Sequence, residues 1–250
     1  MVRMGRITSN LTLLPAMFLL VMAPFTAQAQ TLSLDLGPSG GTTERALQLI
    51  ALITILSIAP AILVMVTSFT RLVVVLSLLR SAIGTASAPP NTVIISLALF
   101  LTAFIMAPTA KEVYANAVSP LLAGTITADI AFERGTGPVR TFMLKHVREK
   151  DLNLFLDIAK APLPQEPEAT PLTSLIPAFM ISELRRAFEI GFLLFMPFLV
   201  IDLVVASILM SVGMMMLPPT TVSLPFKLIF FVLVDGWALI AGSLVQSFGP

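Results

Sequence analysis

The segment from Pro177 to Met216 constrains the fold of this chain more than any other part of the sequence. Its apolar part is long enough to cross a bilayer core, which takes roughly 20 residues. A charged side chain facing lipid there would cost about 2.5–3.5 kcal/mol even on insertion scales. Its ionisable groups are therefore predicted to face protein or a water-filled path, as in a membrane assembly. These groups are Glu183, Arg185, Arg186, Glu189 and Asp202.

The composition supports a membrane protein and excludes several classes of function. Apolar residues make up 56% of the chain and charged residues 12%, against about 45–50% and about 25% in globular domains. The net charge of +1 gives no reason to expect nucleic acid, and the absence of cysteine excludes thiolate chemistry. The one histidine, His146, lies among charged residues and is expected to be exposed and without a role. No phosphate loop or metal-ligand spacing occurs, so we expect no cofactor, no metal and no enzyme activity.

The N-terminus has the features of a secretory signal peptide. Arg3 and Arg6 precede a short apolar stretch, and small residues lie at the positions that signal peptidase reads. We predict a signal over residues 1–29, cleaved between Ala29 and Gln30, followed by a flexible leader over 30–45. The alternative is a retained first membrane helix, which the prolines inside the apolar stretch disfavour.

Four apolar helical regions are predicted, arranged as two hairpins. The first hairpin covers residues 46–108, with a kinked helix over 46–79 and a second helix over 91–106 that ends near Pro108. The second hairpin covers residues 172–250 and ends in a helix over 222–245. Each hairpin turns at a proline pair, Pro89 with Pro90 and Pro218 with Pro219.

Residues 109–171 form a more polar insertion between the hairpins. An amphipathic helix is predicted over 139–160, followed by a proline-rich connector. A cleaved signal and four crossings would place this insertion in the periplasm and the proline turns toward the cytoplasm. Arg71 and Arg80 near the first turn agree with the positive-inside bias. The fold class is therefore all-α and membrane-associated.

Two long motifs carry a resemblance to a known family. The first runs from Pro177 to Gly191 and the second from Pro197 to Met216, and both are similar, without gaps, to signatures of the FliP family of flagellar type III export-gate proteins. Shorter matches lie at Thr67–Arg71 with Pro89–Asn91, at Phe142–Leu144 with Arg148–Asp151, and at Asp235–Trp237. The resemblance covers about residues 45–248, and the signal peptide favours the flagellar branch over injectisome relatives.

The resemblance implies a function and a set of partners. Several copies of such a protein assemble with FliQ and FliR into a closed, helical, ring-like channel, with FlhB and FlhA as further expected partners. Unfolded flagellar proteins pass through it at the basal body in the bacterial inner membrane. The hairpins are then held largely above the membrane plane, despite their apolar composition.

A run of methionines closes the second motif. The resemblance implies that Met210, Met214, Met215 and Met216 line a constriction of the channel, a methionine gasket. Methionine is flexible and polarizable, so several such side chains can close around an irregular chain. The alternative is ordinary apolar packing at the end of a helix.

The charged residues are expected to form a network between helices or subunits. Glu183, Arg186 and Glu189 are spaced to share a helix face, where pairing would offset part of the cost of burial. The alternative is a solvated start of the helix at the membrane edge. Asp202 is expected to pair with Lys227 or with a backbone donor. The full expected network is Arg71, Glu183, Arg185, Arg186, Glu189, Asp202, Lys227 and Asp235.

Two other classes of function use the same residues. Asp202 and Asp235 lie in different apolar helices and would form the dyad of an intramembrane aspartyl protease if they faced each other. Asp235, however, precedes Gly236 and Trp237 and lacks the sequence setting typical of such proteases. An ion- or proton-coupled carrier would use Asp202, Asp235 and Lys227, but no inverted repeat supports it.

Overall fold

The computed structural model describes residues 42–85, 87–160, 166, 169–214 and 216–249. The predicted signal cleavage between Ala29 and Gln30, the leader before Thr42 and the side chain of Met215 lie outside the described residues. The chain divides into residues 1–52 and a compact unit of residues 53–250, and the division falls inside the first described helix. The larger unit contains all residues of the expected charged network and of the expected methionine gasket.

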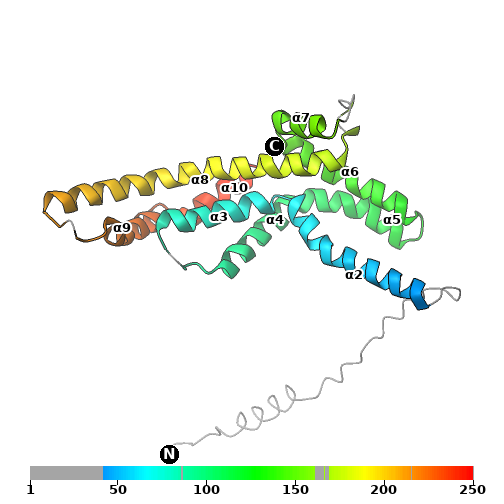
Figure 1. Ribbon diagram of the computed structural model, residues 1–250, viewed down its shortest axis with the longest axis horizontal. Helices are drawn as coiled ribbons and strands as arrows, with labels where there is room; N and C mark the ends of the chain where they lie inside the picture. Colours follow the sequence, from blue (N-terminus) through cyan, green and yellow to red (C-terminus); the bar gives the residue numbers. More distant parts are fainter. Residues whose placement is uncertain (1–41, 86, 161–165, 167–168, 215, 250) are drawn as a thin grey trace, which may run out of the picture. The chain divides into compact units, whose positions relative to one another are not determined.

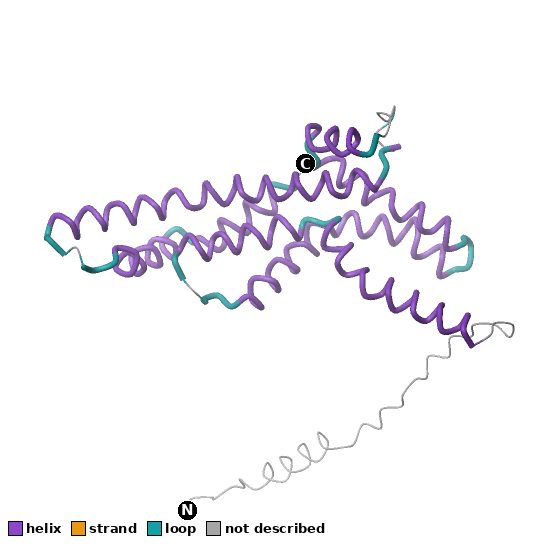
Figure 2. The backbone as a smooth tube through the Cα atoms, in the orientation of Figure 1, coloured by secondary structure: helices purple, strands orange, loops and turns teal. Residues whose placement is uncertain are grey.

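The described residues form helices and connecting turns and contain no strand, which confirms the all-α fold class (Figures 1 and 2). The helices are α2 (Thr42–Met65), α3 (Phe69–Ile83), α4 (Asn91–Val113), a π-helical turn η1 (Tyr114–Val118), α5 (Ser119–Leu122), α6 (Ala128–His146), α7 (Glu149–Ile158), α8 (Leu172–Ser211), α9 (Pro219–Leu233) and α10 (Gly236–Gln246).

Two described helical stretches are long and apolar enough to cross a membrane, Asn91–Leu122 and Leu172–Ser211. The count rises to four if α2 with α3, and α9 with α10, each form one broken span. The four expected apolar regions are therefore present. The 40 residues of α8 span about 60 Å at 1.5 Å per residue, about twice the thickness of a bilayer core.

The core of the unit lies between α3 and α8. One face of α3 is fully buried and carries Leu72, Val75 and Leu79. The two helices approach closely at Gly191 of α8, because a Cβ atom there would collide with the side chain of Leu78. The first half of α8 is thereby fixed against α3, and these two helices carry the charged residues of interest.

Three helix boundaries differ from the sequence-based expectation. α4 continues through Pro108 to Val113 and does not end near it, and α4 packs against α6, which offsets the missing hydrogen bond at the proline. The helix expected over 139–160 is instead two helices, because residues 147 and 148 are extended and the amide of Arg148 donates to Ser182 Oγ. The last helix is broken by 63° at Asp235, which has a positive φ of 50°.

Candidate functional site

A buried ion pair joins the two helices at the centre of the core. Arg71 of α3 is 1% exposed and Glu183 of α8 is 0% exposed. Arg71 Nε donates to Glu183 Oε2 at 2.8 Å, and Nη2 donates to the other carboxylate oxygen, so the pair is bidentate. Bidentate arginine–carboxylate pairs are among the strongest hydrogen-bonded contacts in proteins. Both charges can be buried here because each satisfies the other.

The remaining donors of Arg71 bind the C-terminal end of the chain. Arg71 Nη1 donates to the backbone oxygen of Ser247 at 3.3 Å and to its hydroxyl at 3.0 Å. The ring of Phe248 covers the guanidinium, with 3.6 Å between the ring centroid and Cζ. Arg71 therefore connects α3, α8 and the residues after α10. Neither Ser247 nor Phe248 was among the site residues predicted from the sequence.

A second ion pair joins the end of α3 to the second hairpin. Lys227 Nζ of α9 lies 2.6 Å from Asp202 Oδ2 of α8 and donates to the backbone oxygen of Ala82 at 3.3 Å. Ser223 donates to the other carboxylate oxygen of Asp202. Ala82 lies in the last turn of α3, where the helix dipole favours a cation. Lys227 thus holds three helices together.

The second ion pair is more exposed to solvent than the first. The side chain of Lys227 is 6% exposed and that of Asp202 is 30% exposed. Both line an open cavity of about 460 Å³, together with the hydroxyl residues Thr220 and Thr221 and the turn after α3 at Gly84. Asp202 has Ser223 and Lys227 as its hydrogen-bond partners, and Asp235 is not among them.

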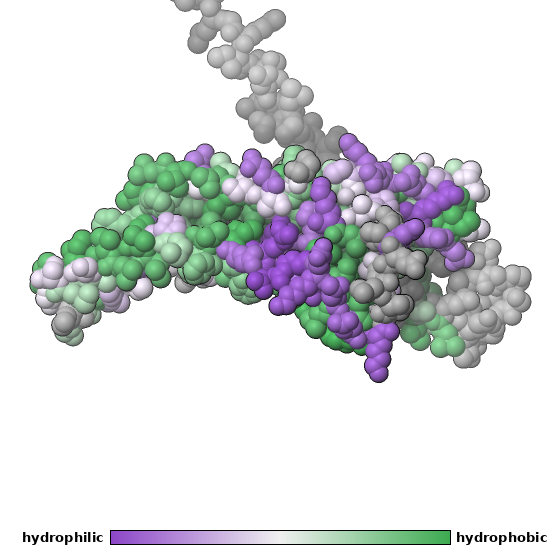
Figure 3. Space-filling view, turned by 90° about the horizontal axis from the view of Figure 1, so that it is seen from above, coloured by the Kyte–Doolittle hydropathy of each residue, from purple (hydrophilic) through white to green (hydrophobic). Residues whose placement is uncertain are grey.

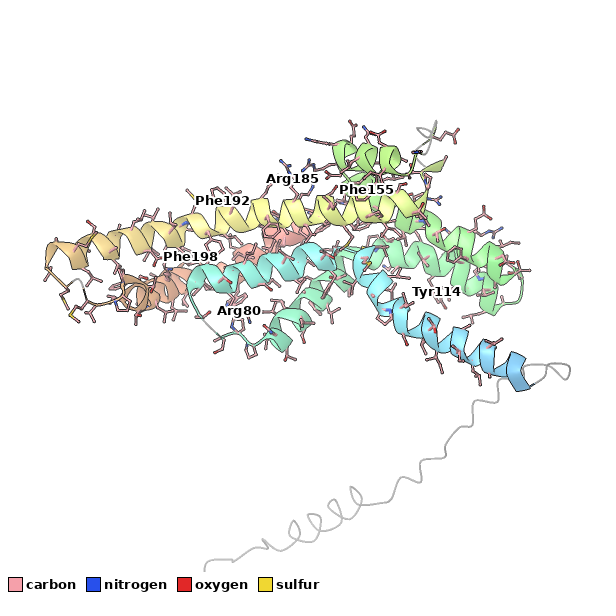
Figure 4. The ribbon with its side chains drawn as sticks, viewed as in Figure 1. Arg80, Tyr114, Phe155, Arg185, Phe192 and Phe198 are labelled. Atoms are coloured by element: carbon pink, nitrogen blue, oxygen red, sulfur yellow. The ribbon has the colours of Figure 1, made fainter. Side chains whose placement is uncertain are left out.

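The other charged residues of α8 lie on its exposed surface. Arg185 Nε contacts Glu189 Oε1 at 2.9 Å, and Arg186 is exposed as well. Arg185 lies on the side of α8 that faces away from α3 (Figure 4). Glu183 is paired with Arg71 across the core, so it is not part of a common face with Glu189. Asp235 precedes α10 and makes no side-chain cap.

The described methionines of the terminal run are exposed. Met210 near the end of α8 is 59% exposed, Met214 is 46% exposed and Met216 is 98% exposed. The helix ends after Ser211, and Gly213 turns the chain with a positive φ of 78°. The surrounding α8–α9 hairpin presents a largely hydrophobic surface (Figure 3). Within this chain, Met210, Met214 and Met216 are thus not packed into a core.

The prediction that His146 is exposed is wrong. His146 is buried at the end of α6, where Nδ1 lies 2.8 Å from the backbone oxygen of Phe142. Its ring packs on those of Phe142 and Phe248. Burial lowers the pKa of His146, and the hydrogen bond to the Phe142 carbonyl opposes that shift. The positive charges of Arg71, Lys145 and Arg186 lower the pKa further. The helical spacing of Phe142 and His146 was the available signal for a shared buried face.

Comparison with known proteins agrees with the motifs. The FliP family model matches residues 52–244. The flagellar biosynthetic protein FliP of Caulobacter vibrioides is 61% identical over 226 residues, covering 90% of this chain and 85% of that protein. FliP of Bacillus subtilis is 55% identical over 201 residues, covering 80% and 91%. FliP of Aquifex aeolicus is 50% identical over 235 residues, covering 93% and 98%. The chain therefore belongs to the FliP family and is a membrane component of the flagellar export apparatus.

Proposed function

We propose that this chain is a channel-forming core subunit of the flagellar type III export gate, which gives unfolded flagellar proteins a path across the inner membrane. The proposal rests on the different positions of the charged and the apolar side chains. The deeply placed charges are satisfied inside the chain, whereas α8 and α9 expose many large apolar side chains, including Phe192, Leu203 and Phe226. Such a surface suits neighbouring subunits and lipid.

The partners follow from family membership and this surface. Several copies of the chain assemble with FliQ and FliR, and FlhB and FlhA join the same apparatus. The exposed residues Arg185, Arg186 and Glu189 are available for contacts between subunits. We place residues 1–29 as a cleaved signal, residues 109–171 in the periplasm, and the hairpins 46–108 and 172–250 in or against the inner membrane.

A catalytic role is not part of this proposal. A protease dyad needs two carboxylates that share a proton, and Asp202 is instead bonded to Ser223 and Lys227. An ion-coupled carrier would need the Asp202–Lys227 pair to open and close during transport. The same pair ties α3 to α8 and α9, which favours a structural role over a carrier.

Native mass spectrometry of the detergent-extracted complex tests the proposal. The chain would be co-expressed with FliQ and FliR, with each omitted in turn as a control. A discrete hetero-oligomer with several copies of the chain, each beginning at Gln30, is the expected species. A monomer or simple dimer that binds neither FliQ nor FliR would contradict the channel function.

The methionine gasket forms a second part of the proposal. Met210, Met214 and Met216 are exposed at one end of the α8–α9 hairpin, where copies arranged in a ring would bring them together. Flexible thioether side chains can close a pore to ions and still yield to a passing polypeptide. Met215 belongs to the same run and is assigned to the gasket with them.

Replacing Met214, Met215 and Met216 with alanine is expected to leave assembly intact and make the membrane leaky to small ions. Shorter side chains would leave an open hole where the methionines close the pore. Leakage is measured as ion flux in cells that express the full complex. Met196→Ala is the matched control, because Met196 is an exposed methionine of α8 outside the run. Unchanged leakage together with normal export would contradict the gasket.

A further inference from the structure

The C-terminal residues after α10 are docked into an aromatic and cationic pocket. Phe248 is buried, and its ring lies over Arg71, at 6.1 Å and nearly parallel to the ring of Phe142, and at 5.2 Å from the ring of His146. Ser247 adds two hydrogen bonds from Arg71. The pocket is built from α3 and α6, so docking of the C-terminus connects elements that are far apart in the sequence.

His146 is neutral when the pocket is filled in this way. Nδ1 faces the carbonyl oxygen of Phe142, so Nδ1 carries the proton and Nε2 does not. A second proton would give this buried ring a positive charge. Burying a charge without a counter-ion is costly. Phe248 packs against this ring, so release of Phe248 would let water reach a protonated His146.

The charges around His146 oppose its protonation. Arg71 on α3, Arg186 on α8 and Lys145 on α6 all act on the ring as positive charges. The carboxylates of Glu183 and Asp151 are bound to other groups and not to His146. Glu183 on α8 is held by Arg71, and Asp151 on α7 accepts from Ser182 and pairs with Arg148. The described residues after α10, Ser247 to Gly249, carry no charged side chain.

We propose that His146 and Phe248 form a pH-sensitive latch, which holds the C-terminal segment on Arg71 when His146 is neutral and releases it when His146 is protonated. Release would uncover the guanidinium of Arg71 and remove both of its contacts to Ser247. Arg71 would keep its bond to Glu183, so α3 and α8 stay joined while the end of α10 becomes free. The device therefore acts on the C-terminus without unfolding the core.

The direction of the pH effect is set by proton binding. The pKa of His146 is lowered from 6.5 in the docked state, chiefly by burial, and it returns toward that ordinary value when the segment is released. The released state therefore binds the proton more readily. Docking is strongest above pH 6.5. The ratio of released to docked chains rises by at most about tenfold per pH unit as the pH falls from that value toward the lower pKa of the docked state, and is constant below it.

The mobility of a spin label near the C-terminus reports whether the C-terminal segment is docked or released. The sequence contains no cysteine, so Gln246→Cys gives one labelling site in the full chain, and Gln246 is exposed directly before Ser247. The label is attached at neutral pH, and its mobility in the detergent-extracted complex is then recorded from pH 8 to pH 5. We expect one immobilised signal at pH 8 and a mobile signal that grows below pH 6.5.

Two further variants make the result decisive. His146→Gln keeps an N–H donor for the Phe142 carbonyl but does not titrate, so its mobile fraction should stay constant with pH. Phe248→Ala should give the mobile signal already at pH 8. A wild-type signal that does not change between pH 8 and pH 5, or the same pH response in the His146→Gln variant, would overturn the latch.

Discussion

Replacing Glu183 with leucine is expected to destabilise the protein by about 3–5 kcal/mol, the usual cost of removing one partner of a buried ion pair. Arg71 would keep its charge with 1% exposure, because a guanidinium does not deprotonate in proteins. Arg71→Leu should cost less, since the carboxyl group of Glu183 can take up a proton when it is left alone. Thermal unfolding of the detergent-solubilised protein measures the destabilisation of both variants. The melting temperature should fall by about 2–4 °C for each kcal/mol.

The double variant Arg71→Leu/Glu183→Leu distinguishes loss of the whole ion pair from the cost of leaving one buried charge unpaired. Apolar replacement of a whole buried pair is often neutral, so the double variant should be more stable than Glu183→Leu alone. The matched control is Glu189→Leu on the same helix, because Glu189 belongs to an exposed pair whose loss should cost at most about 0.5 kcal/mol. If Glu183→Leu and Glu189→Leu unfold at the same temperature, the buried pair does not stabilise the fold.

The helical character of the chain could be predicted from its sequence because apolar composition and length are local properties. Runs of apolar residues bounded by proline pairs predicted four regions, and the structure contains them. Asp202 and Lys227 are only 25 residues apart and lie on opposite sides of one turn. Two helices joined by a short turn are neighbours, so a contact between these residues could be anticipated from their spacing.

Contacts between distant elements could not be predicted in this way. Arg71 and Glu183 are separated by 112 residues, and no periodicity relates their positions. Spacing within α8 suggested Arg186 as the neighbour of Glu183, but Arg186 is exposed and Glu183 faces the core. A fully buried carboxylate needs a partner that is buried with it, and only packing of α3 on α8 supplies one. The burial of His146 has the same origin, because Phe248 arrives from the other end of the chain.

Of the two unexpected helix breaks, one had a signal in the sequence. Asp235 and Gly236 form an Asp-Gly pair, a common turn signal, and Asp235 adopts the left-handed conformation that such pairs favour. The break at Val147 had no comparable signal. It depends on the hydrogen bond from the amide of Arg148 to Ser182 Oγ, which is a contact with α8.

Replacing Lys227 with methionine is expected to cost about 1–3 kcal/mol, the penalty for leaving buried acceptors without their donor. The ammonium serves two acceptors at once, Asp202 Oδ2 and the backbone oxygen of Ala82. The loss should be smaller than that of Glu183→Leu, because Asp202 is 30% exposed and water can solvate it. Thermal unfolding in detergent measures the difference between the two variants.

Lys227→Arg tests whether charge alone is sufficient at this site. A Cβ atom on Gly84 would lie only 3.9 Å from Lys227 Nζ, so the end of the lysine side chain is already close to the backbone of the turn after α3. A planar guanidinium directs its donors differently from the compact ammonium, which here serves two acceptors at once. We therefore expect Lys227→Arg to remain less stable than wild type although its charge is kept. A fully stable Lys227→Arg protein would show that a positive charge, and not the shape of the ammonium, is what holds α3 to α8 and α9.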